Sequence, residues 1–203
     1  YADVPASEVN RAEGKVATAN QAIFAGQNAQ SLVDGSRSAV VHGVETPQPG
    51  YAYTINLGSS VRLSRIVLWP RQDACCPDRL TNFRVSVLSD NAGQPGDVVW
   101  KADRYTDGSF PLTEPGSRDT LLADLDPTGS FRGQWIRIES LEDPVSPYAL
   151  QLAEVQAFGE AEGGVNVLLT QSPQPASTGV GRTVTFTAAA TAVNGDPTLL
   201  GYQ

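Results

Sequence analysis

The chain has little of what most catalytic and metal centres use: no methionine, one histidine and two cysteines among its 203 residues. That scarcity excludes a metal cluster built from histidine and cysteine. No Gly-x-Ser-x-Gly elbow or phosphate-binding loop is present, so catalysis finds little support. Glycoside hydrolysis by a pair of carboxylates stays an open alternative, because acidic residues are common in the sequence. No apolar run approaches the roughly 20 residues that cross a bilayer, and no signal segment opens the chain.

Positive charge is also scarce. The only lysines are Lys15 and Lys101, and the net charge is -8 with a pI near 4.6. Nucleic acids and anionic membranes are bound by clustered Lys and Arg, so neither is an expected partner. A neutral ligand or a cation is the easier match.

Short apolar or alternating segments separated by turn residues dominate the sequence, whereas helical periodicity is weak. This pattern predicts an all-β, antiparallel β-sandwich of the jelly-roll type. The turn signals are 48–50, 90–93, 94–96 and 126–129. The predicted strands are 51–57, 62–69, 82–88, 98–100, 119–124, 134–139 and 150–158.

A short acidic, glycine-rich linker at 160–164 is expected to divide the chain. After a segment at 1–11, the sandwich occupies 12–159, and 165–203 begins a second β domain with strands near 165–169 and 183–187. About forty residues are too few for a sandwich of about 100, so the missing strands belong to the rest of that domain or to another molecule. High Gly, Pro, Ser and Thr content predicts a secreted or cell-surface piece of a longer precursor.

The segment from Arg71 to Arg79 holds both cysteines, Cys75 and Cys76, side by side. A bridge between them would be strained, because neighbouring Cα atoms lie about 3.8 Å apart, closer than usual for a disulfide. The alternative is a pair of reduced thiols in a core. The polar residues around the pair favour an exposed loop that carries the bridge, with a stiff apolar ring between two guanidinium groups. Such a surface suits a sugar, which has an apolar face and an edge of hydroxyls.

Three blocks give the sandwich a resemblance to a known family. They are 31–36 with His42 downstream, 71–79 followed by 80–83, and 152–158. On these residues, 12–159 resembles the F-type lectin (fucolectin) family, a branch of the galactose-binding-like folds that include discoidin and coagulation-factor C-type domains. The segment 171–186 resembles the start of a bacterial immunoglobulin-like domain.

The resemblance implies a sugar site in which a histidine and two arginines hold the hydroxyl edge of a terminal fucose against a vicinal disulfide. Asp73 would orient an arginine rather than touch the sugar. Ala74 is a departure, since it adds one residue before the cysteine pair. The implied site residues are His42, Arg71, Asp73, Cys75, Cys76 and Arg79.

The resemblance also implies a structural Ca²⁺ ion, held by two carboxylates and by loop carbonyl oxygens, which are the ligands that Ca²⁺ prefers. The implied ligands are Ser31, Asp34, Ser36, Ala39, Ala153 and Glu154.

Each of these residues also has a structural interpretation. The only histidine of a chain is usually a surface or structural group, and Arg79 could pair with Asp78. Asp34 could begin an ordinary turn, and Glu154 could be an exposed strand residue.

The leading hypothesis is a non-catalytic, carbohydrate-binding module that tethers a larger protein to glycans. The alternative is a structural or adhesive extracellular subunit that assembles through protein contacts without binding sugar.

Overall fold

The computed structural model describes residues 8–46, 48–73, 75, 79–80, 82–104, 119–121, 132–141, 150–160, 166–171 and 189–194. The chain divides into two compact units, Tyr1–Glu160 and Ala161–Gln203. The elements of the first unit are β1 (Glu8–Asn10), β2 (Val16–Ala19), the 3₁₀ helix η1 (Ala29–Val33), β3 (Ala52–Pro70), β4 (Phe83–Asn91), β5 (Gln94–Arg104), β6 (Asp119–Leu121), β7 (Arg132–Ser140) and β8 (Leu152–Glu160).

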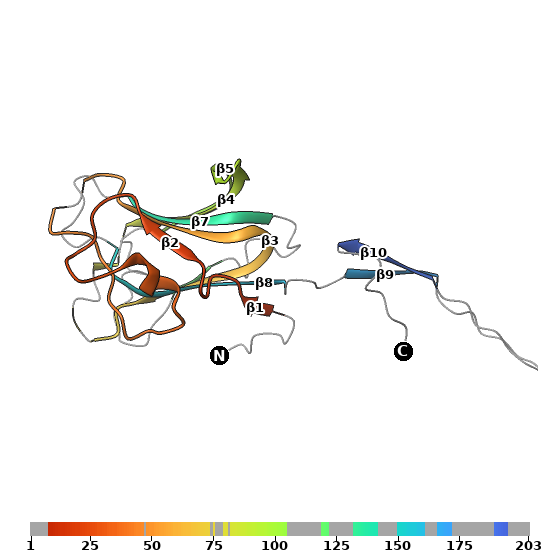
Figure 1. The fold of residues 1–203 in the computed structure, drawn as a ribbon, viewed down its shortest axis with the longest axis horizontal. Coiled ribbons are helices and arrows are strands. Elements are labelled where there is room, and N and C mark those ends of the chain that lie inside the picture. Colours follow the sequence, from red (N-terminus) through yellow and green to blue (C-terminus); the bar gives the residue numbers. More distant parts are fainter. Residues whose placement is uncertain are drawn as a thin grey trace, which may run out of the picture. The chain divides into compact units, whose positions relative to one another are not determined.

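Two antiparallel layers form the first unit, and β3 belongs to both (Figure 1). The first half of β3 pairs with β2 and β7, and the ladder continues through β4 to the edge strand β5. The second half pairs with β8 and β6, and β8 pairs with β1. This arrangement is the predicted all-β antiparallel sandwich.

The predicted strands 51–57 and 62–69 are one bent strand. The register between β3 and β7 shifts between Asn56 and Val61. Gly58 lies in this bend with a φ of +86°, a conformation that favours glycine. Its N–H donates to Asn56 Oδ1 at 2.8 Å. The bend lets a single strand cross from one layer to the other.

The turn between β4 and β5 confirms one predicted turn and corrects another. Ala92 and Gly93 have φ values of +51° and +82°, and Asn91 pairs with Gln94. Positive φ at both central residues is the geometry of a two-residue hairpin turn. The chain has therefore already reversed before the predicted turn at 94–96, and those residues begin β5. Pro95 is tolerated there because β5 is an edge strand.

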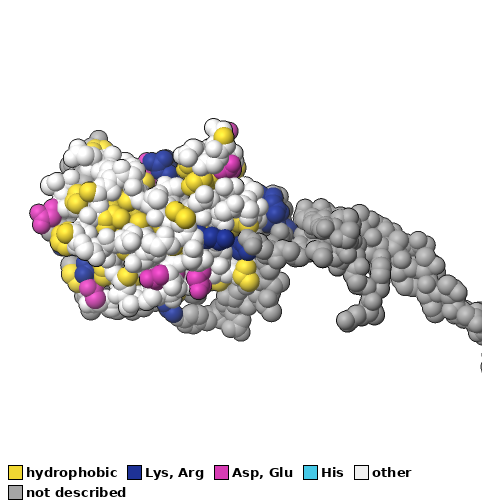
Figure 2. Space-filling model, in the orientation of Figure 1, with side chains coloured by type: hydrophobic (Ala, Val, Ile, Leu, Met, Phe, Trp, Pro, Cys, Tyr) yellow, Lys and Arg dark blue, Asp and Glu magenta, His cyan; other side chains and the backbone are white. Residues whose placement is uncertain are grey.

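Alternate residues of both layers point inward and form one apolar core. From β3 the core takes Tyr53 and Ile55 on one layer and Ile66 and Leu68 on the other, all with 0% exposure. The outward face shown in Figure 2 mixes hydrophobic, acidic and basic side chains without a broad basic patch. No helix among the described residues is long and apolar enough to cross a membrane.

In the second unit, β9 (Asn166–Gln171) and β10 (Ala189–Asn194) form an antiparallel pair. β9 agrees with the strand predicted at 165–169. The strand predicted at 183–187 lies outside the described residues, and β10 was not predicted. The immunoglobulin-like character of this unit stays a prediction.

Candidate functional site

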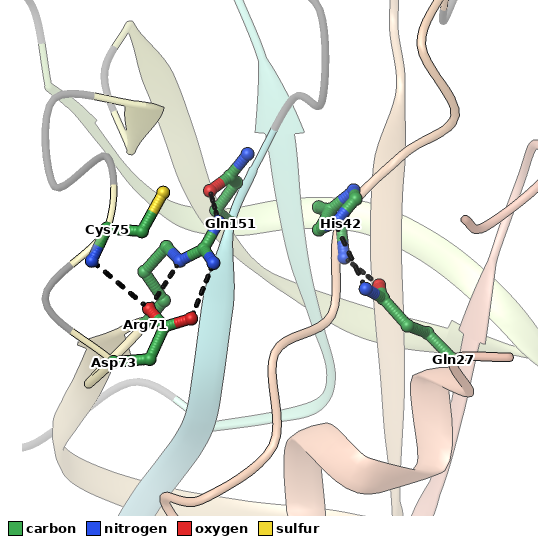
Figure 3. Close-up of polar contacts among 6 residues, drawn as sticks. All are labelled: Gln27, His42, Arg71, Asp73, Cys75 and Gln151. Atoms are coloured by element: carbon green, nitrogen blue, oxygen red, sulfur yellow. Dashed lines mark hydrogen bonds and ion pairs between the residues drawn. The ribbon is translucent and has the colours of Figure 1, made fainter. Parts of the chain in front are cut away.

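Arg71 follows β3 directly and is held from two sides (Figure 3). Its Nε and Nη2 donate to the two carboxylate oxygens of Asp73 at 2.7 and 2.6 Å. Its Nη1 donates to Gln151 Oε1 at 2.7 Å. The Arg71 side chain is only 13% exposed, whereas that of Asp73 is 49% exposed. The hydrogen bonds from Arg71 lower the pKa of Asp73 to about 2, so this carboxylate is ionised at neutral pH. Asp73 therefore contacts an arginine, and its role in orienting that arginine toward a sugar stays a prediction.

Cys75 lies beside this pair. Its backbone N–H is 3.4 Å from Asp73 Oδ1, and its sulfur belongs to a disulfide. Cys76 and the added Ala74 lie outside the described residues.

His42 reaches the same region from the segment between η1 and β3, and it is buried. Its Nδ1–H donates to the Gly43 carbonyl at 2.8 Å, which leaves Nε2 as an acceptor. Gln27 fills that role, because its Nε2 donates to His42 Nε2 at 3.0 Å while its Oε1 accepts from the His42 backbone N–H at 2.9 Å. This side-chain arrangement keeps the imidazole neutral and fixed.

The charges of both arginines of the predicted site act on His42. Burial lowers the pKa of His42, the hydrogen bond to Gly43 opposes that shift, and the positive charges of Arg71 and Arg79 lower the pKa further. The structure thus brings Arg71, Asp73 and Cys75 together with His42 nearby (Figure 3), and Arg79 is linked to them by its charge acting on His42. Their role in binding a sugar stays a prediction.

Gln27 and Gln151 were missed by the sequence analysis. Each contacts a predicted residue that is far away in the chain: 15 positions separate Gln27 from His42, and 80 separate Gln151 from Arg71. The only available signal was the position of Gln151 directly before the block 152–158.

A second polar cluster surrounds Glu154, in β8. Glu154 is 0% exposed, so its interpretation as an exposed strand residue is wrong. Its Oε1 accepts from the Gly35 N–H at 3.2 Å, whereas its buried Oε2 has no hydrogen-bond partner in the part of the chain that the structure describes. Burial raises the pKa of Glu154 to about 8, and the negative charges of Asp34 and Glu13 contribute to the rise.

The loop opposite Glu154 is a tight turn after η1. Asp34 caps η1, and its Oδ1 accepts from the Ser36 N–H at 2.8 Å. Gly35 has a φ of +82°. Of the predicted metal ligands, Asp34 and Glu154 therefore lie in one cluster, with Ala153 next to Glu154 and fully buried. No three acidic, histidine or cysteine side chains in the described ranges form a metal site alone. A cation here would need the carbonyl donors that were predicted.

Comparison with known proteins supports the fold directly. Residues 31–113 match the family described as the NedA-like, galactose-binding domain of the F5/F8 type C group. No curated protein sequence matches the chain. The lectin domain of lectinolysin, solved with Lewis B antigen, is 21% identical, with a TM-score of 0.57, and the match covers 75% of this chain and 98% of that domain.

The sandwich has the galactose-binding-like fold. Two further structures share it. A fucose-binding module of Streptococcus pneumoniae is 22% identical, with a TM-score of 0.57 and coverage of 73% of this chain and 96% of that module. A family 32 carbohydrate-binding module of C. perfringens NanJ, solved with galactose, is 18% identical, with a TM-score of 0.54 and coverage of 74% and 98%. The galactose-binding-like resemblance inferred from the sequence is confirmed at the level of the fold.

Proposed function

We propose that the first unit is a carbohydrate-binding module that recognises terminal sugars such as fucose and tethers a larger extracellular protein to glycans. The observation that carries this proposal is the Arg71 guanidinium, which Asp73 and Gln151 hold beside the disulfide-bonded Cys75 and near His42. An immobilised, charged donor with a planar fork is well suited to the oxygens of a neutral ligand.

The disulfide of Cys75 supplies the apolar half of this proposed site. The sequence holds only one other cysteine, Cys76, so we assign the bridge to the adjacent pair. The ring that such a bridge closes would lie against the apolar face of a sugar, while Arg71 and Arg79 bind its hydroxyl edge.

His42 would accept a sugar hydroxyl at Nε2, because its Nδ1–H is already donated to Gly43. Gln27 now contacts that nitrogen, so its side chain must turn away when a sugar binds. Gln27 is partly exposed, which leaves it room to do so.

Similar structures support the same class of ligand. They are complexes with Lewis B antigen and with galactose, and a fucose-binding module. These structures are binding modules or lectin domains, which fits a non-catalytic role here.

We also propose a structural Ca²⁺ ion at Glu154. The buried Oε2 has no partner among residues that the structure describes, which fits a cation, because an unpaired carboxylate oxygen is costly to bury. Asp34 would share the ion with Glu154, and carbonyl oxygens of Ser31, Ser36, Ala39 and Ala153 would complete the set. The ion would neutralise the two carboxylates and hold the loop after η1 against β8.

The alternative is a structural or adhesive subunit that does not bind sugar. One observation favours it: Gln27 already satisfies His42, so the described conformation is complete without a ligand.

A glycan array probed with the whole chain separates these functions. We expect binding to fucosylated or related terminal sugars, and loss of that binding after mild reduction of the Cys75 disulfide. Chelation of Ca²⁺ should weaken it through the loop after η1. Arg79→Ala should abolish binding with little change in thermal unfolding. A silent array with an intact disulfide would support the structural alternative, and unchanged binding by Arg79→Ala would remove Arg79 from the site.

A further inference from the structure

The edge of the sandwich aligns three chain segments at the start of β8. Val41 and Leu152 form an isolated antiparallel bridge, with backbone hydrogen bonds of 2.8 and 3.0 Å in both directions. Leu152 is also the register partner of Pro70, the last residue of β3. One row of residues therefore runs from the segment after η1, through β8, to the end of β3.

The next row is set by this register. In antiparallel pairing, a step forward on one segment meets a step backward on its neighbour, and adjacent rows point to opposite faces. Val41 and Leu152 point into the core, so the next row, His42, Gln151 and Arg71, points away from it with Gln151 in the middle. Figure 3 shows Gln151 between the Arg71 cluster and His42.

Gln151 is unusual for a residue in this position. Its side chain is 1% exposed, and Oε1 accepts from Arg71. Its buried Nε2 has no hydrogen-bond partner among the described residues. An unsatisfied buried donor costs about 1–3 kcal/mol. An apolar side chain of similar size would avoid that cost, so the reason for an amide here lies in its contact with Arg71.

The hydrogen bonds of Arg71 indicate that contribution. A guanidinium has five N–H donors in one plane. Two go to Asp73 and one to Gln151, which leaves two without a partner among the described residues. Asp73 is half exposed and lies only two residues from Arg71. If Asp73 were the only partner, the two side chains could move together. Gln151 is buried and directly precedes a different strand, β8, so its bond to Arg71 fixes the plane of the guanidinium.

We propose that Gln151 is a positioning residue of the sugar site, which holds the Arg71 guanidinium so that its two remaining donors face neighbouring oxygens of the ligand. This inference rests on the proposed function. In this proposal, Oε1 of Gln151 orients Arg71, and that orientation determines the affinity for a sugar with adjacent hydroxyls.

Two substitutions separate the acceptor of Gln151 from its bulk. Gln151→Met keeps the size and removes the acceptor, whereas Gln151→Glu keeps an acceptor for Arg71. Calorimetric titration with a Lewis b oligosaccharide should show about tenfold weaker binding for Gln151→Met, equivalent to about 1.4 kcal/mol. Gln151→Glu should restore most of the affinity. Wild-type affinity in Gln151→Met, or equally weak binding by both variants, would overturn the proposal.

Gln156→Met is a matched control in β8, the strand that follows Gln151. Gln156 Oε1 also accepts a hydrogen bond, from Trp69 Nε1 at 3.0 Å, but that contact lies outside the proposed site. The control should bind the oligosaccharide as the wild type does.

A measurement without ligand keeps the two proposals distinguishable. Nitrogen-15 NMR of the arginine side chains, with the Arg71 signals assigned by Arg71→Met, reports rotation about the Cζ–Nη bonds. We expect slow rotation in the wild type and in Gln151→Glu, and faster rotation in Gln151→Met. If the wild type binds no sugar but these rates differ, the proposed function fails and Gln151 still positions Arg71. Equal rates in all three proteins would overturn the positioning role.

Discussion

The two carboxylates Asp73 and Glu154 lie in opposite environments. Asp73 is half exposed, both its oxygens accept from Arg71, and its pKa is about 2. Glu154 is fully buried, one of its oxygens has no partner within the described ranges, and its pKa is about 8. Both oxygens of the first carboxylate have a hydrogen-bond partner, and they hold the guanidinium of Arg71. The positive charge of Arg37 only partly offsets the burial of the second, and a bound metal ion would supply further positive charge. The partners of each carboxylate, rather than its mere presence, thus distinguish the proposed sugar site at Asp73 from the proposed Ca²⁺ site at Glu154.

The largest expected effect is on the pH dependence of stability without Ca²⁺. The pKa of Glu154 in the folded protein lies above the ordinary value of 4.5, so the folded protein binds this proton more tightly than the unfolded chain does. The resulting stabilisation is fully present below pH 4.5 and is lost as the pH rises to about 8. We expect the free energy of unfolding to fall across this window by a few kcal/mol, at about 1.4 kcal/mol per pKa unit.

Urea denaturation in chelator at several pH values measures this dependence. Glu154→Gln should flatten it, because the amide does not titrate. Glu139→Gln, which changes a glutamate that accepts from Arg137 on β7, should leave it intact. A wild-type slope retained in Glu154→Gln would show that another group is responsible.

The next effect is the response to Ca²⁺ itself. At a concentration 100 times its Kd, an ion that binds only the folded state adds about 2.7 kcal/mol. For a unit of this size that corresponds to a rise in Tm of about 5–10 °C. Glu154→Gln should remove the rise, as measured by calorimetry with Ca²⁺ and with chelator. An equal rise in the variant would exclude Glu154 as a ligand.

The smallest of the three effects in free energy compares two arginines. Arg71→Met should weaken sugar binding by about 10–150-fold, because a hydrogen bond to a charged group contributes about 1.5–3 kcal/mol. It should also return the pKa of Asp73 toward 3.8, which an NMR titration follows. Isothermal titration with the Lewis b oligosaccharide measures the affinity.

Arg84→Met is the matched control for Arg71→Met. Arg84 also makes a bidentate pair, with Asp103 at 2.6 and 2.8 Å, but on the outer face between β4 and β5. It has no role in the proposed site, so Arg84→Met should bind sugar normally. Equal losses in the two variants would indicate a general effect on the fold.

Local sequence patterns were enough to predict much of the fold and part of the candidate site. Alternation along the chain identified the strands, and the position of Asp73 between two arginines suggested that it orients one of them. The bend at Gly58 was read as a break, because glycine and serine mark turns and bends alike in a sequence. Gln151 and Gln27 could not be found, because their partners depend on the register between segments that lie far apart in the chain. Burial of Glu154 likewise follows from the loop after η1 closing over β8.

The bent strand β3 has a consequence for motion in the molecule. Two stretches of it are paired with neighbours on both sides: residues 53–56 with β2 and β7, and residues 66–68 with β8 and β6. Amides in such a strand exchange with solvent only when several ladders open together, so they belong to the slowest-exchanging class. Arg71 is attached one residue beyond this segment. The backbone that carries the proposed sugar site thus starts from the part of the protein that opens last.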